Sequence, residues 1–133
     1  MRRMQLNRIK IDENRHEQVI ILKDDNGEVF LPVVIGLPEV HAIKLQLSGI
    51  KPPRPLTHDL LKELIHSLGA TLKHVIIDKL EKKTFYAKLV LHDRDEQEII
   101  VDARPSDSIA LALRASVPIY VEETILEEAG IQQ

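Results

Sequence analysis

One pattern of elements occurs twice in this chain, and the repeat constrains the fold more than any other feature of the sequence. Residues 19–47 contain two apolar strand-like segments around the turn 24–27 (Asp-Asp-Asn-Gly), followed by Pro38 near the start of an apolar helix. Residues 87–113 repeat this order, with Pro105 in the corresponding place. A duplicated β-hairpin–helix unit explains both copies, with chance as the competing explanation because proline is common at helix starts. The mixture of hairpins and helices predicts an α+β fold with a mixed or antiparallel sheet.

Length and composition indicate a single domain that covers residues 1–133. A chain of 133 residues with 44% hydrophobic residues can bury one core. The absence of cysteine excludes a disulfide scaffold, a cysteine zinc site and a cysteine nucleophile, and it suits a reducing compartment. No stretch approaches the roughly 18 apolar residues of a membrane span, and no apolar segment follows the basic N-terminus as in a secretory signal. We therefore expect a cytoplasmic protein with no membrane partner.

Apolar periodicity and turn residues predict the remaining elements. Thr57 suits the N-cap of a second helix, Gly49 and Gly69 suit helix ends, and Pro32 indicates an edge strand or a bulge. The third helix is apolar on most sides and should be buried. The predicted strands are 4–11, 19–22, 29–35, 72–80, 84–91, 98–103 and 117–121, and the predicted helices are 38–47, 57–68, 106–115 and 124–129.

Charge is distributed unevenly along the chain. The net charge is -3, but residues 51–83 carry seven Lys or Arg against four Asp or Glu, whereas residues 93–133 carry three against ten. The central segment could therefore face an anion, although an unevenly charged solvated surface explains the same numbers. With no Trp, two Phe and two Tyr, the chain is poorly equipped to stack on exposed bases.

Two polar clusters lie at predicted helix N-termini, where free N–H groups and the helix dipole favour anions such as phosphate. Arginine can neutralise a phosphate, and histidine can move a proton near neutral pH. These parts suffice for phosphodiester hydrolysis. The first cluster is Lys51, Arg54, Thr57, His58 and Asp59, and the second is Asp102, Arg104, Ser106 and Asp107.

Each residue of the clusters has a role in this hypothesis. Asp59 and Asp107 are candidate ligands for Mg²⁺ or Mn²⁺, with Asp102 in support, because these ions prefer oxygen ligands. Arg54 and Arg104 would neutralise the phosphate, and His58 would be the acid or base. The substrate-binding candidates are Lys51, Thr57 and Ser106.

Purely structural explanations compete with every one of these roles. The two first-turn aspartates are favourable against the helix dipole alone. Thr57 and Ser106 suit simple caps, the arginines suit structural ion pairs, and His58 suits a packing role. Because no nucleotide-binding glycine motif or paired-histidine zinc motif is present, we expect no organic cofactor and no zinc.

Three segments resemble the bifunctional nuclease domain family. They are residues 50–61 (IKPPRPLTHDLL), residues 101–112 (VDARPSDSIALA) and the stretch from Leu31 to Gly36 that leads to Glu39. The resemblance covers about residues 19–130, and the one departure, Val40, occupies a position without chemistry. It implies an α+β fold with an internal duplication and nuclease activity on DNA and RNA. It assigns no catalytic residues, so the roles above depend on chemistry.

Two functions follow from these observations. The first is a nuclease without strong sequence specificity, whose partners are DNA and RNA. The second is a non-enzymatic regulatory module that binds an anion or a partner at the same polar site. We also expect a homo-oligomer, most simply a dimer, because of the Pro-bearing strand and the apolar third helix. In a shared site, Arg54 should lie near Asp102 or Asp107.

Overall fold

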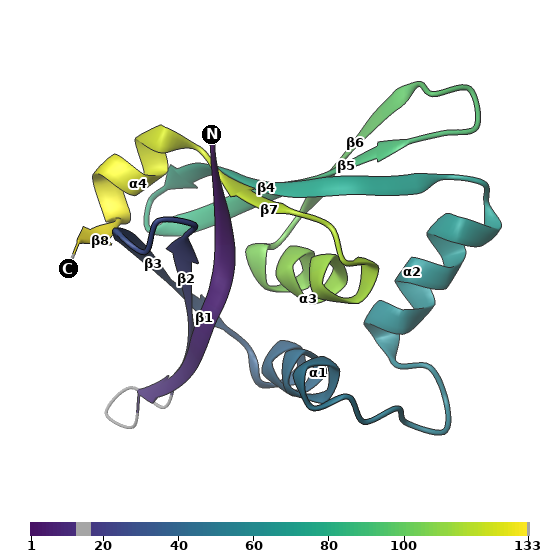
Figure 1. The fold of residues 1–133 in the computed structure, drawn as a ribbon, viewed down its shortest axis with the longest axis horizontal. Helices are drawn as coiled ribbons and strands as arrows, with labels where there is room; N and C mark the ends of the chain where they lie inside the picture. Colours follow the sequence, from purple (N-terminus) through teal and green to yellow (C-terminus); the bar gives the residue numbers. More distant parts are fainter. Residues whose placement is uncertain (13–16, 133) are drawn as a thin grey trace.

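A computed structural model describes residues 1–12 and 17–132 of the chain and arranges them as one eight-stranded sheet with four helices (Figure 1). Neighbouring strands are antiparallel except β4 and β7, which pair in parallel, so the sheet is mixed and the predicted α+β class is confirmed. The strand order is β6-β5-β4-β7-β1-β2-β3-β8. The strands are β1 (Arg2–Asp12), β2 (Glu17–Asp24), β3 (Val29–Ile35), β4 (Thr71–Glu81), β5 (Thr84–His92), β6 (Glu98–Ala103), β7 (Ile119–Val121) and β8 (Ile131–Gln132), and the helices are α1 (Leu37–Ser48), α2 (Thr57–Ser67), α3 (Pro105–Ala115) and α4 (Glu123–Ala129).

The two repeated segments form the same supersecondary structure. The hairpin β2–β3 leads into α1, and the hairpin β5–β6 leads into α3. Each hairpin also pairs with the strand before it, β1 or β4, so each half is a three-stranded antiparallel meander followed by a helix. In the sheet, β7 lies between the two halves and pairs with the first strand of each, β1 and β4. The predicted hairpin–helix order is therefore confirmed in both units.

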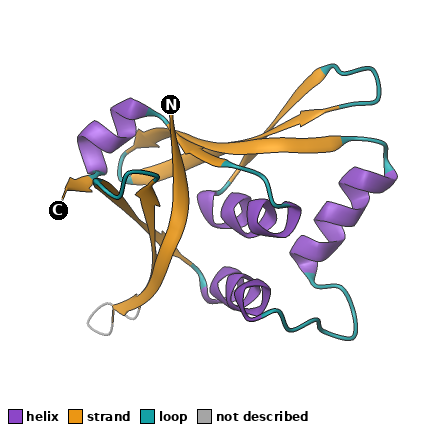
Figure 2. Cartoon of the chain, viewed as in Figure 1, coloured by secondary structure: helices purple, strands orange, loops and turns teal. Residues whose placement is uncertain are grey.

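Helix α3 is the centre of the core. It packs against α1 and α2 and against strands of both halves, and Figure 2 shows the three helices gathered on one side of the β4–β5 strands. Ile109, Ala110, Leu111 and Ala112 are almost fully buried. The prediction of a buried third helix is confirmed. Because this apolar surface is used inside the fold, it is not the association surface that the sequence suggested.

Local turn chemistry explains where the elements begin and end. Gly27 adopts a left-handed φ of 71° in the β2–β3 turn, and Gly49 adopts 73° after α1, conformations that strain other residues. Pro32 lies on β3 beyond its short pairing with β8, where the missing N–H breaks no ladder. The last predicted strand is shorter than expected because β7 begins only at Ile119, and the two-residue β8 carried no signal in the sequence. Among the described residues, no helix is long and apolar enough to cross a membrane.

Helix α2 differs from the other helices because part of its apolar side faces solvent. Leu60, Leu64 and Leu68 are exposed, whereas Ile65 packs against the core. The edge strand β6 likewise exposes Ile99, Ile100 and Val101. The fold thus leaves apolar side chains uncovered on α2 and β6, beside the region where the predicted polar clusters lie.

Candidate functional site

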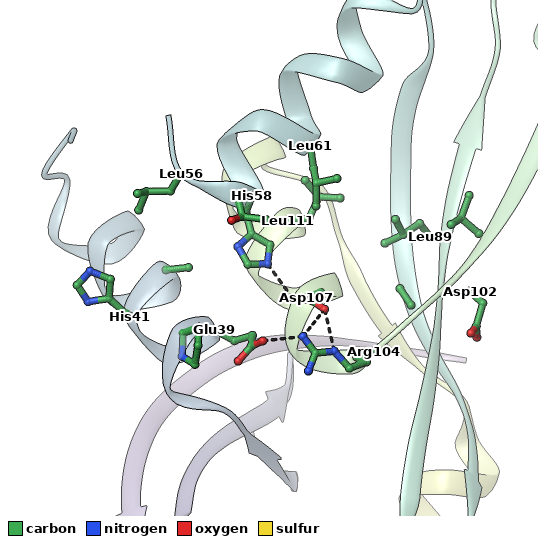
Figure 3. A pocket seen from close by; sticks show the side chains of 15 residues that line it. Glu39, His41, Leu56, His58, Leu61, Leu89, Asp102, Arg104, Asp107 and Leu111 are labelled. Atoms are coloured by element: carbon green, nitrogen blue, oxygen red, sulfur yellow. Dashed lines mark hydrogen bonds and ion pairs between the residues drawn. The ribbon is translucent and has the colours of Figure 1, made fainter. Parts of the chain in front are cut away.

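The N-terminal ends of α1, α2 and α3 meet at one cavity of about 580 Å³, which β5 and β6 close on the other side. We call it the His58 cavity. Figure 3 shows its polar side chains converging from the three helices. Its lining residues are Pro38, Glu39, His41, Ala42, Leu56, Thr57, His58, Leu61, Leu89, Val101, Asp102, Ala103, Arg104, Asp107 and Leu111.

Each of the three helices carries an acidic residue at its third position. These residues are Glu39 in α1, Asp59 in α2 and Asp107 in α3. A carboxylate in the first turn is favourable against the positive end of the helix dipole. Glu39 and Asp107 are each the third residue of the helix in their repeated unit, so the duplication brings two carboxylates to one cavity. The two prolines do not correspond exactly as the sequence suggested, because Pro38 is the second residue of α1 and Pro105 is the first residue of α3.

Arg104 lies between these two carboxylates. Its Nη2 donates to Glu39 Oε1 at 2.6 Å, and its Nε donates to Asp107 Oδ2 at 2.9 Å. The carboxylates of Asp107 and Glu39 raise the pKa of the Arg104 guanidinium, which stays charged. Its Nη1 makes no hydrogen bond to the described part of the chain, and the side chain is 67% exposed. Arg104 therefore keeps an N–H edge that can donate to a ligand.

His58 is a nearly buried histidine bound to the other oxygen of Asp107. The distance from His58 Nε2 to Asp107 Oδ1 is 2.9 Å. When the aspartate is ionised, Nε2 carries the proton, so Nδ1 of the neutral ring is left as a proton acceptor. Figure 3 shows this second nitrogen on the side of the ring away from Asp107. The histidine is thus held in one orientation, as an acid–base group requires.

Asp59 adjoins His58 in sequence but serves a structural contact. Its Oδ1 accepts from Arg114 Nε at 2.7 Å, and its Oδ2 accepts from the backbone N–H of Leu56 at 3.0 Å. Burial acts to raise the pKa of Asp59, but the Leu56 N–H and the Arg114 guanidinium outweigh burial and lower the pKa. Arg114 also donates to the backbone carbonyls of Ala42 and Ala110. This buried arginine therefore links α1, α2 and α3 through its hydrogen bonds.

The structure separates the predicted site residues into two groups. Five of them line the His58 cavity, namely Thr57, His58, Asp102, Arg104 and Asp107. Three line a neighbouring cavity on the other flank of α2, namely Lys51, Arg54 and Asp59. Arg54 therefore lies with Asp59 and Arg114 and not among the residues that border Asp102 and Asp107, where the sequence placed it.

The structure also places Ser106 and Asp102 and identifies the N-cap residues of α2 and α3. Ser106 is buried and lines neither cavity. The N-cap residues of α2 and α3 are Leu56 and Arg104, so the capping roles considered for Thr57 and Ser106 are wrong. Asp102 lies at the rim of the His58 cavity, where it binds Lys88.

Sequence reasoning missed two residues of the site. Glu39 was visible only as the counterpart of Asp107 in the first repeat, and its binding to Arg104 is a contact across 65 positions. His41 lines the same cavity, but an isolated histidine gives no signal in the sequence. The repeat and the motif from Leu31 to Gly36 both lead to Glu39, but neither pattern predicts that it binds Arg104.

The predicted Mg²⁺ or Mn²⁺ site does not fit this arrangement. Asp59 and Asp107 line different cavities, and both oxygens of each carboxylate already accept hydrogen bonds from the chain. Among the described residues, no group of three or more His, Asp and Glu is placed to hold a metal ion. An ion at Asp107 would have to displace Arg104 or His58.

Known proteins resemble nearly the whole chain. The family model of the bifunctional nuclease domain matches residues 20–133. An uncharacterized protein of Mycobacterium tuberculosis is 48% identical over 123 residues, which are 92% of this chain and 73% of the relative. Bifunctional nuclease 2 of Oryza sativa subsp. japonica is 30% identical over 126 residues, and bifunctional nuclease 1 of Oryza sativa subsp. indica is 27% identical over 123 residues. The match covers 92% and 91% of this chain but only 38% and 37% of these plant relatives.

Proposed function

Because the chain belongs to the bifunctional nuclease domain family, we propose that it is a nuclease that hydrolyses phosphodiester bonds of DNA and RNA without strong sequence specificity. One observation carries this proposal beyond the family: His58, Asp107, Arg104 and Glu39 form a continuous chain of hydrogen bonds along one cavity. It combines an oriented proton acceptor with an exposed cation. The absence of cysteine suits action in the reducing cytoplasm, which is part of the proposal.

His58 would act as the general base. Its Nδ1 accepts a proton from a water molecule as the water oxygen forms a bond to phosphorus and one P–O ester bond breaks. The leaving oxygen takes its proton from solvent. Asp107 does not touch the substrate in this scheme, but it holds the imidazole and stabilises the positive charge that His58 gains.

Arg104 would bind the phosphate through Nη1. Charge builds on the phosphoryl oxygens in the transition state, where a fixed cation stabilises it most. Glu39 and Asp107 hold the guanidinium through Nη2 and Nε, so that the remaining Nη1 can donate to a phosphate without reorganising the side chain. The N-terminal N–H groups of α2 and α3 add favourable dipoles on the same side.

A second function is favoured by the balance of charge in the cavity. Glu39, Asp102 and Asp107 outnumber Arg104 there, so the cavity alone does not attract a polyanion. A non-enzymatic module that binds a partner at this site, or a small anion through Arg104 alone, would not need to attract a polyanion. The two functions differ in one measurable property, which is turnover.

Cleavage of labelled single-stranded DNA and RNA by purified wild type, Arg104→Ala and His58→Ala tests the proposal. We expect each variant to lose at least about 100-fold in rate, which is the typical effect of losing one such group. Arg3→Ala and His66→Ala are matched controls on exposed residues outside the His58 cavity and should cleave as wild type does. Equal rates for all five proteins would refute the assignment and indicate a contaminating nuclease.

The same assay is run with Mg²⁺, with Mn²⁺ and with a chelator. Loss of cleavage on chelation would show that the reaction needs a cation and would contradict the scheme in which the side chains act alone. Cleavage that persists would support the scheme in which the side chains act without an ion.

A further inference from the structure

The neighbouring cavity carries the positive charge that the His58 cavity lacks. We call it the Lys51 cavity. It has a volume of about 480 Å³ and lies between the end of α1, the proline-rich loop and α2. Its cations are the exposed Lys51, Arg54 and Lys62 and the buried Arg114.

The three exposed cations are free to bind an anion. None of them forms an ion pair with the described residues. The one carboxylate in the cavity, Asp59, is already bound by Arg114 at 2.7 Å. The cavity therefore has three uncompensated positive charges, in a chain whose net charge is -3.

The two cavities lie on either side of the first turns of α2. His58 and Leu61 line the His58 cavity, whereas Asp59 and Lys62 line the Lys51 cavity. His58 and Lys62 are separated by about one helical turn, or roughly 6 Å along the axis. Prolines at 52, 53 and 55 restrict the loop that carries Lys51 and Arg54, so these cations lose less entropy when they bind a ligand.

We propose that the Lys51 cavity binds backbone phosphates of the nucleic-acid strand whose scissile phosphate lies at Arg104. This inference rests on the proposed function and adds to it the source of substrate affinity and one residue, Lys62, that the sequence did not single out. The His58 cavity supplies the chemistry, and the Lys51 cavity supplies the electrostatic attraction. The contacts are to phosphate and carry no sequence information, as expected of a nonspecific nuclease.

The salt dependence of binding gives a quantitative test. Each phosphate neutralised on a single strand contributes about 0.7 to the slope of log affinity against log salt concentration. The triple variant Lys51→Gln, Arg54→Gln, Lys62→Gln should reduce the slope by about 2 and weaken binding at least tenfold at low salt. The control triple variant Lys73→Gln, Lys82→Gln, Lys83→Gln removes the same charge at other exposed positions and should retain the slope.

Fluorescence anisotropy of a labelled single-stranded oligonucleotide measures this binding in a His58→Ala background, so cleavage does not interfere. Equal losses in the two triple variants, or no loss in either, would overturn the inference. A second outcome is that the oligonucleotide binds through the Lys51 cavity but wild type, which retains His58, does not cleave it. That result would refute the proposed function and leave phosphate binding by the Lys51 cavity standing. Tight binding of a mononucleotide without oligonucleotide binding would overturn both.

An independent observation concerns the exposed leucines of α2. Leu60, Leu64 and Leu68 recur at intervals of four residues and form one stripe, on the opposite flank of the helix from Lys62. The edge strand β6 also exposes Ile99, Ile100 and Val101, but these residues alternate between the two faces of the sheet, and Val101 lines the His58 cavity. Three exposed leucines on one side of a helix favour association with a partner.

We infer that a second copy of this chain covers the stripe in a two-fold dimer. Leu60 and Leu68 flank Leu64 at equal spacing, so an antiparallel pair of α2 helices that cross at Leu64 places Leu60 of each copy against Leu68 of the other. A two-fold interface requires this kind of self-complementarity.

Sedimentation velocity at micromolar concentration tests the dimer. Wild type should sediment as a dimer, and Leu64→Lys should sediment as a folded monomer with an unchanged circular dichroism spectrum. Val34→Lys is the matched control, because Val34 on β3 is 59% exposed and Leu64 is 47% exposed. A monomeric wild type, or a dimer that persists in Leu64→Lys, would overturn the inference.

Discussion

Two arginines at opposite ends of α3 make similar ion pairs in very different surroundings. Arg104 binds Glu39 and Asp107 at the helix start with a side chain that is 67% exposed, whereas Arg114 binds Asp59 in the last turn with a side chain that is 4% exposed. Arg114 has its Nε, Nη1 and Nη2 occupied by the protein, while Nη1 of Arg104 has no hydrogen-bond partner among the described residues. The comparison separates an arginine that stabilises the fold from one that can bind a ligand.

The largest expected effect is on stability, from Arg114→Ala. Removing Arg114 leaves the Ala42 carbonyl and the Asp59 carboxylate without their partner and opens a cavity among three helices. We expect the free energy of unfolding to fall by about 3 kcal/mol, as for the loss of one partner of a buried pair. Urea denaturation followed by circular dichroism measures it.

Arg104→Ala is the internal control for that prediction. Glu39 is buried, but the Arg104 side chain that covers its carboxylate is 67% exposed, so its removal lets water solvate both carboxylates. The unfolding free energy should therefore fall by about 1 kcal/mol, less than for Arg114→Ala. Equal destabilisation by the two alanine variants would erase the distinction between the arginines.

The next effect in size is the pH dependence contributed by Asp59. Because the folded protein lowers the pKa of Asp59, its ionised form stabilises the fold above its unfolded pKa of about 3.9, and this contribution is lost as pH falls through the lowered folded value. Asp59→Asn should therefore cost about 1–2 kcal/mol at pH 7. The difference in stability between wild type and variant should shrink as pH falls below about 3.9.

Urea titrations at pH 7, 4 and 2.5 compare the two proteins. Asp24, whose pKa is also lowered, is common to both and cancels in the difference. Asp102→Asn is the control, since this exposed carboxylate binds Lys88 and no other side chain among the described residues. A difference between Asp59→Asn and wild type that stays constant down to pH 2.5 would contradict the ionic role of Asp59.

Local sequence predicts the turns, the helix starts and the repeat, but it does not predict contacts between distant elements. The turn at Gly27, the helix starts near Pro38 and Pro105 and the repeated unit follow from local chemistry, and each was predictable. The pairing of Glu39 with Arg104 was not, because it depends on how α1 and α3 pack.

The grouping of His58 with Asp59 shows a different kind of error. Consecutive helical residues point about 100° apart, so the two side chains face different cavities. Helical geometry alone is enough to separate these two side chains. The position of Arg54 cannot be inferred this way, because it depends on the path of the proline-rich loop.

The smallest effect is expected from Gly36→Ala. A Cβ at Gly36 would lie 2.6 Å from Glu39 Oε2, so the carboxylate has to move. Glu39 positions Arg104 but does not itself contact the substrate, so the cleavage rate should fall only a few fold. The free energy of unfolding should change by less than about 1 kcal/mol. Glu39→Gln should reproduce the loss of activity, and a Gly36→Ala enzyme with wild-type rate would show that Glu39 does not position Arg104.

The central claim is that the free edge of Arg104 binds the scissile phosphate, and chemical rescue tests it most directly. Arg104→Ala leaves a solvent-accessible space of guanidinium shape in the His58 cavity. We predict that millimolar guanidinium chloride raises the cleavage rate of Arg104→Ala at least about tenfold. It should not raise the rate of His58→Ala or of wild type. A contaminating nuclease could not produce this pattern. Cleavage by Arg104→Ala that equals wild type, or that does not respond to guanidinium, would contradict the claim.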